Sequence, residues 1–147
     1  MQIAMIGTGY VGLVSGTCFS EFGFNVVCVD KDDAKIERLK SNKIPIYEPG
    51  LDALVERNQT AGRLSFTTNL KDAVSRADVV FIAVGTPTRR GDGYADLSYV
   101  FSAAKEIAGS MSGYTVVVTK STVPVGTGKQ VFDIIKSENP DLNFDIA

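Results

Sequence analysis

Histidine and tryptophan are absent from this sequence of 147 residues, and cysteine occurs only twice. Without histidine, the side chain that most often acts as general acid or base near neutral pH is missing, so proton transfer must depend on other groups. Two cysteines alone are too few soft ligands for a zinc site, and no metal site is predicted. We interpret Cys18 and Cys28 as small residues of a buried helix face and a core strand.

The sequence also lacks an excess of positive charge and any long apolar run. Its 15 basic and 17 acidic side chains leave a net charge of −2, which gives no basic surface for nucleic acid. No apolar run approaches the roughly 20 residues that span a bilayer, and no positively charged leader precedes an apolar segment at the N-terminus. We therefore expect a cytoplasmic protein that binds neither nucleic acid nor membrane.

Short apolar runs alternate with longer segments of helical period, a pattern that is typical of βαβ units and a buried parallel sheet. The length and the 44% hydrophobic content suit one domain with one core. Strands are predicted at residues 2–6, 25–30, 64–67, 79–84, 115–120 and 143–147. Helices are predicted at residues 10–22, about 32–41, from 51 onward, 70–76, 97–108 and about 128–137, with Asp96 as the N-cap of the fifth.

This order predicts a doubly wound α/β Rossmann fold, a mostly parallel six-stranded sheet with helices on both faces. The leading strand order is 3-2-1-4-5-6. In such a sheet, ligands bind beyond the carboxyl ends of the strands, where the order reverses. The loops after the first, fourth and fifth strands should therefore converge on one crevice.

The loop after the first strand reads Gly7-Thr8-Gly9-Tyr10-Val11-Gly12, a G-x-G-x-x-G motif between a strand and a helix. Gly7 would allow the tight turn, Gly9 the approach of a pyrophosphate, and Gly12 the close packing of helix on strand. The helix N-terminus at Tyr10 and Val11 would then present free N–H groups to the anion. The motif alone is weak, but its position makes it indicative of a dinucleotide.

Asp30 lies at the end of the second strand, 18 positions after Gly12. In this place a carboxylate accepts hydrogen bonds from the adenosine ribose and repels a 2′-phosphate, so NAD is favoured over NADP. Lys31 and Lys35 weaken that preference slightly, because a nearby cation accommodates the extra phosphate. The alternative interpretation of Lys35 is a residue of a solvated helix face.

Hydroxyl side chains follow the fourth and fifth strands. Thr86, in the Gly-rich loop at residues 85–96, would offer its hydroxyl and N–H to the cofactor, although a simple turn is the rival interpretation. Ser121 and Thr122 follow the fifth strand and would face the nicotinamide ring. Their hydroxyls suit a carboxamide, a water molecule or a substrate, and the residues alone leave a functional role open.

Four segments together resemble the N-terminal domain of the UDP-glucose/GDP-mannose dehydrogenase family, over essentially the whole chain. They are MIGTGYVGLVSG, IYEPGLDAL, FIAVGTPT with RRGDGYADLSYV, and KSTVPVGTG. The resemblance implies NAD-dependent oxidation of the 6-hydroxyl of a nucleotide sugar, UDP-glucose before others, to a carboxylate. It implies that Asp30, Lys35, Thr86 and Val11 contact the cofactor and that Thr122 binds the catalytic water.

The family's catalytic cysteine, lysine and asparagine belong to a later part that these residues do not include, as do its substrate-binding elements and the central helix of its homodimer. We therefore expect residues 1–147 to bind NAD without turnover. Two alternatives stay open. One is a regulatory Rossmann module that senses NAD or NADH, and the other is the same domain of a GDP-mannose or UDP-N-acetylhexosamine dehydrogenase.

Overall fold

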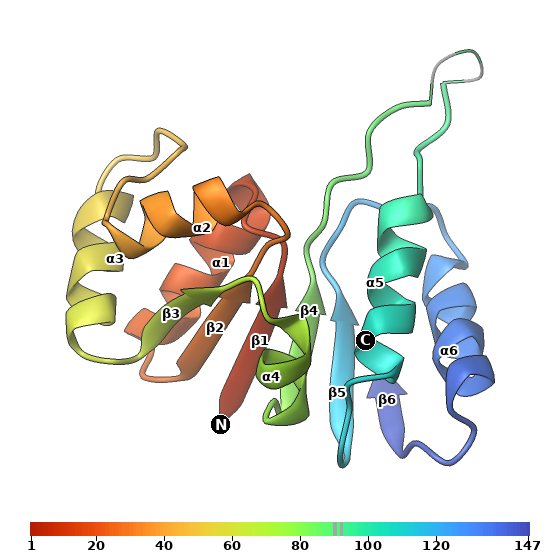
Figure 1. Cartoon of the computed structure of the whole chain (residues 1–147). Helices are drawn as coiled ribbons and strands as arrows, with labels where there is room; N and C mark the ends of the chain where they lie inside the picture. Colours follow the sequence, from red (N-terminus) through yellow and green to blue (C-terminus); the bar gives the residue numbers. More distant parts are fainter. Residues whose placement is uncertain (90, 92) are drawn as a thin grey trace.

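The structure is a computed structural model that describes residues 1–89, 91 and 93–147 (Figure 1). Its six strands are β1 (Gln2–Ile6), β2 (Asn25–Val29), β3 (Leu64–Thr67), β4 (Val79–Ile82), β5 (Thr115–Thr119) and β6 (Phe144–Ile146). Its six helices are α1 (Tyr10–Glu21), α2 (Asp33–Lys40), α3 (Leu51–Thr60), α4 (Leu70–Ser75), α5 (Ser98–Ala108) and α6 (Thr127–Glu138). All of these elements lie within the described residues.

The strands form one sheet in the order β3-β2-β1-β4-β5-β6, and every neighbouring pair is parallel. The predicted order and fold class are therefore confirmed. The order reverses between β1 and β4, which pair directly from Ile3 with Val79 to Ile6 with Ile82. Their carboxyl ends thus lie side by side at one edge of the sheet, where ligands of this fold bind.

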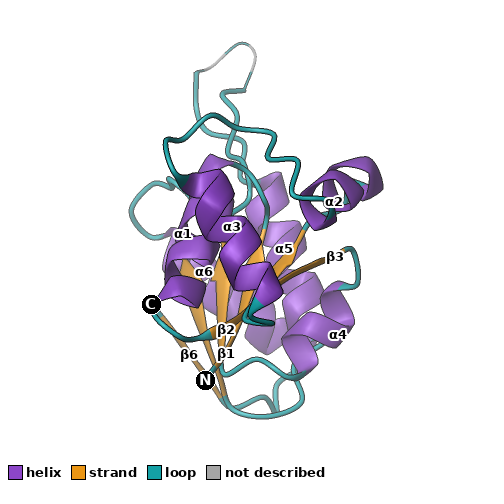
Figure 2. Cartoon of the chain, turned by 90° about the vertical axis from the view of Figure 1, so that its left-hand side faces the viewer, coloured by secondary structure: helices purple, strands orange, loops and turns teal. Residues whose placement is uncertain are grey.

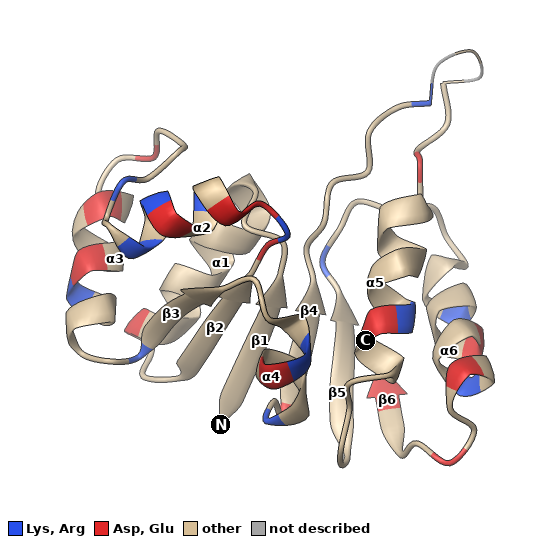
Figure 3. Ribbon diagram, viewed as in Figure 1, with Lys and Arg blue, Asp and Glu red and all other residues tan. Residues whose placement is uncertain are grey.

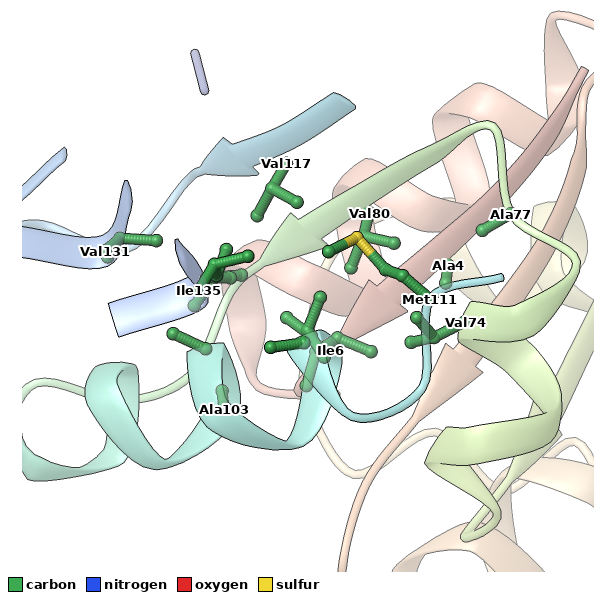
Figure 4. Packing of buried hydrophobic residues seen from close by; sticks show 14 of the residues in the cluster. Ala4, Ile6, Val74, Ala77, Val80, Ala103, Met111, Val117, Val131 and Ile135 are labelled. Atoms are coloured by element: carbon green, nitrogen blue, oxygen red, sulfur yellow. The ribbon is translucent and has the colours of Figure 1, made fainter. Parts of the chain in front are cut away.

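Each face of the sheet has its own hydrophobic cluster, because side chains alternate between the faces along a strand. Ile3, Met5 and Cys28 pack with residues of α1, α2 and α3 on one face. On the other face, Ile6 and Val80 pack with residues of α4, α5 and α6, as Figure 4 shows in part. Figure 2 shows α1 and α3 on one side of the strands and α4 on the other. The prediction of helices on both faces is thereby confirmed.

Most differences from the predicted elements concern their ends. Strand β2 ends at Val29 and not at residue 30, which leaves Asp30 in the loop beyond the sheet. Helix α5 begins at Ser98 after the N-cap Leu97, so the prediction of Asp96 as N-cap was off by one residue. The Asp96 carboxylate nevertheless accepts the Ser98 N–H at 2.9 Å. The predicted loop at residues 85–96 includes Arg90 and Asp92, which lie outside the described residues.

The two cysteines are free thiols. Cys28 is buried, and this burial raises the pKa of its thiol to about 12. Cys18 is half-buried on α1. The interpretation of Cys28 as a small core residue is therefore confirmed, whereas the Cys18 side chain lies nearer the surface than expected.

Candidate cofactor site

A cleft of about 900 Å³ lies at the carboxyl ends of β1, β2 and β4, beside α5. This volume is in the upper part of the range that small-molecule and cofactor sites occupy, roughly 300 to 1,000 Å³. The cleft takes its lining from the segments after β1, β2, β3 and β4 and from α5, and includes Gly7, Gly9, Asp30, Thr68, Gly85 and Ser102. It therefore lies where the strand order reverses, as the fold requires of a ligand site.

Two glycines of the first loop are fixed by close backbone contacts. Gly7 has a φ of +103°, and a Cβ built on it would lie 2.5 Å from the carbonyl oxygen of Ala83. A Cβ on Gly12 would lie 2.0 Å from the carbonyl oxygen of Gly7 itself. No side chain fits at either position. The turn after β1 and the close approach of α1 to the strand thus both depend on glycine.

Gly9 has a different reason to lack a side chain. It is the N-cap of α1 in an ordinary extended conformation, with φ −70° and ψ −172°, and a Cβ here would meet no atom within 4 Å. Since Gly9 lines the cleft, this open space belongs to the site. The next residues, Tyr10 and Val11, are exposed, and no side chain in the described part of the chain caps the first turn of α1. The first-turn N–H groups are thus available to an anion.

Asp30 lines the cleft beside the glycine loop and accepts hydrogen bonds at both carboxylate oxygens. Oδ2 accepts the Thr8 N–H at 2.9 Å, the Thr8 hydroxyl at 2.6 Å and the Lys35 ammonium at 2.8 Å. Oδ1 accepts the Asp32 N–H at 3.2 Å. Partial burial alone would raise the pKa of Asp30, but these donors outweigh it and lower the pKa to about 2. The group is therefore an ionised acceptor at any ordinary pH.

The hydroxyls after β4 and β5 connect the two loops to each other. The Thr86 hydroxyl donates to the carbonyl oxygen of Thr122 at 3.0 Å. The Ser121 hydroxyl donates to the carbonyl oxygen of Val84 at 2.7 Å. Thr122, by contrast, is exposed at its side chain. The Thr86 hydroxyl, which we expected to serve a cofactor, donates to protein backbone in this structure, while its lone pairs can still accept.

The structure brings part of the predicted set together at the cleft. The lining includes Gly7, Gly9, Asp30 and Lys35. Gly12 packs against the Gly7 carbonyl group of the same loop. Tyr10 and Val11 lie on the first turn of α1, and Thr86 and Thr122 lie on the loops after β4 and β5. None of these four is among the described residues that line the cleft.

The sequence prediction missed two close contacts around the glycine loop and α1. Thr8 is fully buried and bonds to Asp30, and a Cβ on Gly16 would lie 2.7 Å from the Cys28 sulfur. Gly12 and Gly16 are four residues apart and therefore lie on the same face of α1. This spacing predicts that the helix packs closely against the strand at that face. For Thr8, the only signal is a hydroxyl between two glycines, which does not by itself identify its partner.

Within the described residues, no helix is long and apolar enough to cross a membrane. The same part of the chain holds no group of three or more histidine, cysteine or acidic side chains that could bind a metal ion. Figure 3 shows acidic and basic residues next to each other on α2 and α6.

Comparison with known proteins gives one consistent result. A sequence model described as the NAD binding domain of the UDP-glucose/GDP-mannose dehydrogenase family matches residues 1–147. The UDP-glucose 6-dehydrogenase of Rhizobium meliloti is 67% identical over 140 residues, which are 95% of this chain and 32% of that protein. The Bacillus subtilis UDP-glucose 6-dehydrogenase TuaD is 55% identical over 147 residues, which are 99% of this chain and 32% of that protein.

Solved structures agree with the sequence matches. A ternary complex of GDP-mannose dehydrogenase from Pseudomonas aeruginosa superposes with a TM-score of 0.94 at 38% identity, over 99% of this chain and 35% of that chain. A UDP-glucose dehydrogenase from Pyrobaculum islandicum superposes with a TM-score of 0.92, also at 38% identity, over 99% of this chain and 34% of that one. The chain therefore spans about a third of the length of the relatives that it matches.

Proposed function

The chain belongs to the UDP-glucose/GDP-mannose dehydrogenase family as its NAD-binding domain, and on this premise we propose that it is the cofactor part of a UDP-glucose 6-dehydrogenase. Relatives of that name at 67% and 55% identity support this substrate, whereas the GDP-mannose dehydrogenase structure is 38% identical. No observation favours another nucleotide sugar or a purely regulatory NAD sensor over this function.

The residues of the cleft fit NAD. The observation that carries the proposal is the pairing of open space at Gly9 with an ionised acceptor at Asp30 in one cleft. We assign the pyrophosphate to the loop from Gly7 to Gly12 and the first turn of α1, including the N–H of Val11. We assign the adenosine ribose to Asp30, with Lys35 as its ion-pair partner at 2.8 Å.

The reaction that we propose for the whole enzyme oxidises the 6-hydroxyl of UDP-glucose to a carboxylate, with two NAD and one water. Bound NAD supplies the hydride acceptor. Thr86 and Thr122 follow the two strands beside the cleft, so we place them near the reacting end of the cofactor. Thr122, with an exposed side chain, is assigned the hydrogen bond to the catalytic water.

Calorimetry of residues 1–147 with NAD and with NADP tests the cofactor assignment. We expect NAD to bind about tenfold more tightly or better, because the Asp30 carboxylate repels a 2′-phosphate. Equal affinity for the two dinucleotides would contradict the role of Asp30.

A turnover assay tests the remainder of the proposal. Residues 1–147 incubated with UDP-glucose and NAD are expected to produce no NADH, since the proposal places the catalytic cysteine and the substrate-binding elements in another part of the enzyme. The full-length protein is expected to oxidise UDP-glucose in preference to GDP-mannose. Sustained NADH formation by residues 1–147, or a preference of the full-length protein for GDP-mannose, would overturn it.

A further inference from the structure

Thr8 connects the glycine loop after β1 to the carboxylate that follows β2. It lies between Gly7 and Gly9 with 0% of its surface exposed. Its N–H donates to Oδ2 of Asp30 at 2.9 Å, and its hydroxyl donates to the same oxygen at 2.6 Å. The second distance is typical of a hydroxyl bonded to an ionised carboxylate, which is roughly twice as strong as a bond between neutral groups. One residue of the glycine loop thus makes two bonds to the acid at the end of β2.

These bonds are not needed to hold the backbone of either loop. The Gly7 N–H already donates to the carbonyl oxygen of Val29 at 2.7 Å, which joins the glycine loop to β2. The Asp30 N–H donates to the carbonyl oxygen of Thr67 at 3.2 Å, which joins the next residue to β3. What the Thr8 hydroxyl adds is therefore the orientation of the Asp30 side chain.

The two oxygens of the Asp30 carboxylate therefore accept different numbers of hydrogen bonds. Oδ2 accepts three donors, namely the two from Thr8 and the Lys35 ammonium. In the described part of the chain, Oδ1 accepts one long bond, from the Asp32 N–H at 3.2 Å. A carboxylate oxygen has about two lone-pair sites. Oδ1 is thus the oxygen that retains capacity for a ligand in the cleft.

We propose that Thr8 is a positioning residue for cofactor selection, which fixes the Asp30 carboxylate so that Oδ1 receives the adenosine ribose. The inference rests on the proposed function, because it requires that Asp30 bind the ribose. It adds that the choice of NAD over NADP depends on a hydroxyl in the glycine loop. A carboxylate free to rotate would present its charge less consistently to a 2′-phosphate, and so would exclude NADP less well.

Thr8→Val tests the proposal, because valine has nearly the shape of threonine and keeps the backbone N–H. Calorimetry with NAD and with NADP gives the ratio of the two Kd values. We expect Thr8→Val to reduce the preference for NAD about tenfold, as the loss of one charge-assisted hydrogen bond predicts. Thr8→Ser retains the hydroxyl and is expected to keep the ratio within about twofold of the native value.

The Asp30 pKa, measured by carboxyl carbon NMR, gives a readout independent of ligand. It should rise from about 2 toward its ordinary value in Thr8→Val and stay low in Thr8→Ser. If Thr8→Val does not fold, Thr8→Ala carries the same expectation. If Thr8→Val lowers the unfolding midpoint but leaves the ratio of the two Kd values unchanged, the proposal is overturned, because Thr8 would then have a structural role only.

Asp30→Asn separates this inference from the proposed function. If Asp30→Asn leaves the Kd ratio unchanged, Asp30 does not select the cofactor and both assignments fail. If Asp30→Asn abolishes the preference for NAD while Thr8→Val leaves it intact, only the inference about Thr8 fails. Loss of the preference in Asp30→Asn and Thr8→Val, but not in Thr8→Ser, supports both.

Discussion

The two sides of the cleft are built by different physical means. On the β1–β2 side, Gly7 and Gly12 leave no room for a Cβ, and Asp30 accepts several charged or buried donors. On the β4–β5 side, neutral hydroxyls join one loop to the backbone of the next, and the described residues between β4 and α5 extend away from the sheet (Figure 1). The first side is thus determined by close steric fit and charge, and the second by hydrogen bonds between neighbouring loops.

The largest effect is expected at Gly12, where the steric fit of the β1–β2 side is tightest. In Gly12→Ala the new Cβ would lie 2.0 Å from the Gly7 carbonyl oxygen, which is backbone and cannot move aside cheaply. We expect the free energy of unfolding to fall by about 3 kcal/mol or more in urea denaturation.

Gly113→Ala is the matched control for this loss. A Cβ at Gly113 would meet no atom within 4 Å, so its unfolding free energy should stay within about 0.5 kcal/mol of the native value. Similar stability of the two variants would show that α1 does not need to approach β1 as closely as the structure has it.

Gly9→Ala should separate binding from folding on the same side of the cleft. The backbone of Gly9 suits any residue, and its Cβ would enter open space, so stability should change by less than about 0.5 kcal/mol. That space is the one assigned to the pyrophosphate, and calorimetry should show NAD affinity reduced about tenfold or more. Unchanged affinity would mean that the dinucleotide does not approach this backbone.

The β1–β2 side was also the more predictable from sequence. Gly7, Gly9 and Gly12 follow one strand at a fixed spacing, and Asp30 follows the next strand. These local spacings indicate a dinucleotide site. Thr8 escaped prediction because its role depends on a partner 22 positions away that only the parallel pairing of β1 and β2 brings near. The strand order followed from the alternation of elements, since few topologies satisfy it.

The β4–β5 side was predicted only in part. Hydroxyls at residues 86, 121 and 122 were expected in one crevice with the glycine loop. They follow β4 and β5 at the carboxyl edge, but none of the three is among the described residues that line the cleft. A threonine or serine hydroxyl rotates to whichever acceptor is near, so a sequence does not state whether it donates to a ligand or to backbone. The structure has Thr86 and Ser121 donating to carbonyl groups across the two loops.

Ser121→Ala and Thr122→Val should differ in stability, although they are adjacent. Ser121→Ala removes the bond to the Val84 carbonyl oxygen and is expected to lower the free energy of unfolding by about 1 kcal/mol. Thr122→Val changes an exposed side chain and should remain within about 0.5 kcal/mol. Urea denaturation of both variants measures the difference. The reverse order would assign the joining of the loops to Thr122.

The smallest effect is expected where the two sides of the cleft meet in an ion pair. The Lys31 ammonium lies 2.6 Å from a carboxylate oxygen of Glu106 on α5, but the two side chains are 75% and 36% exposed. In the Asp30–Lys35 pair the exposures are 19% for Asp30 and 26% for Lys35. Exposed pairs contribute about 0.2 to 1 kcal/mol, and salt screens them.

Double-mutant cycles on the free energy of unfolding compare the two pairs directly. Lys31→Met with Glu106→Gln should give a coupling below about 1 kcal/mol that disappears at high salt. Lys35→Met with Asp30→Asn should give a larger coupling that salt reduces less, because water is partly excluded from that pair. If the Lys31–Glu106 pair couples as strongly as the Asp30–Lys35 pair, then charge joins the β1–β2 side to α5 as strongly as it orients Asp30. The distinction between the two sides would then no longer hold.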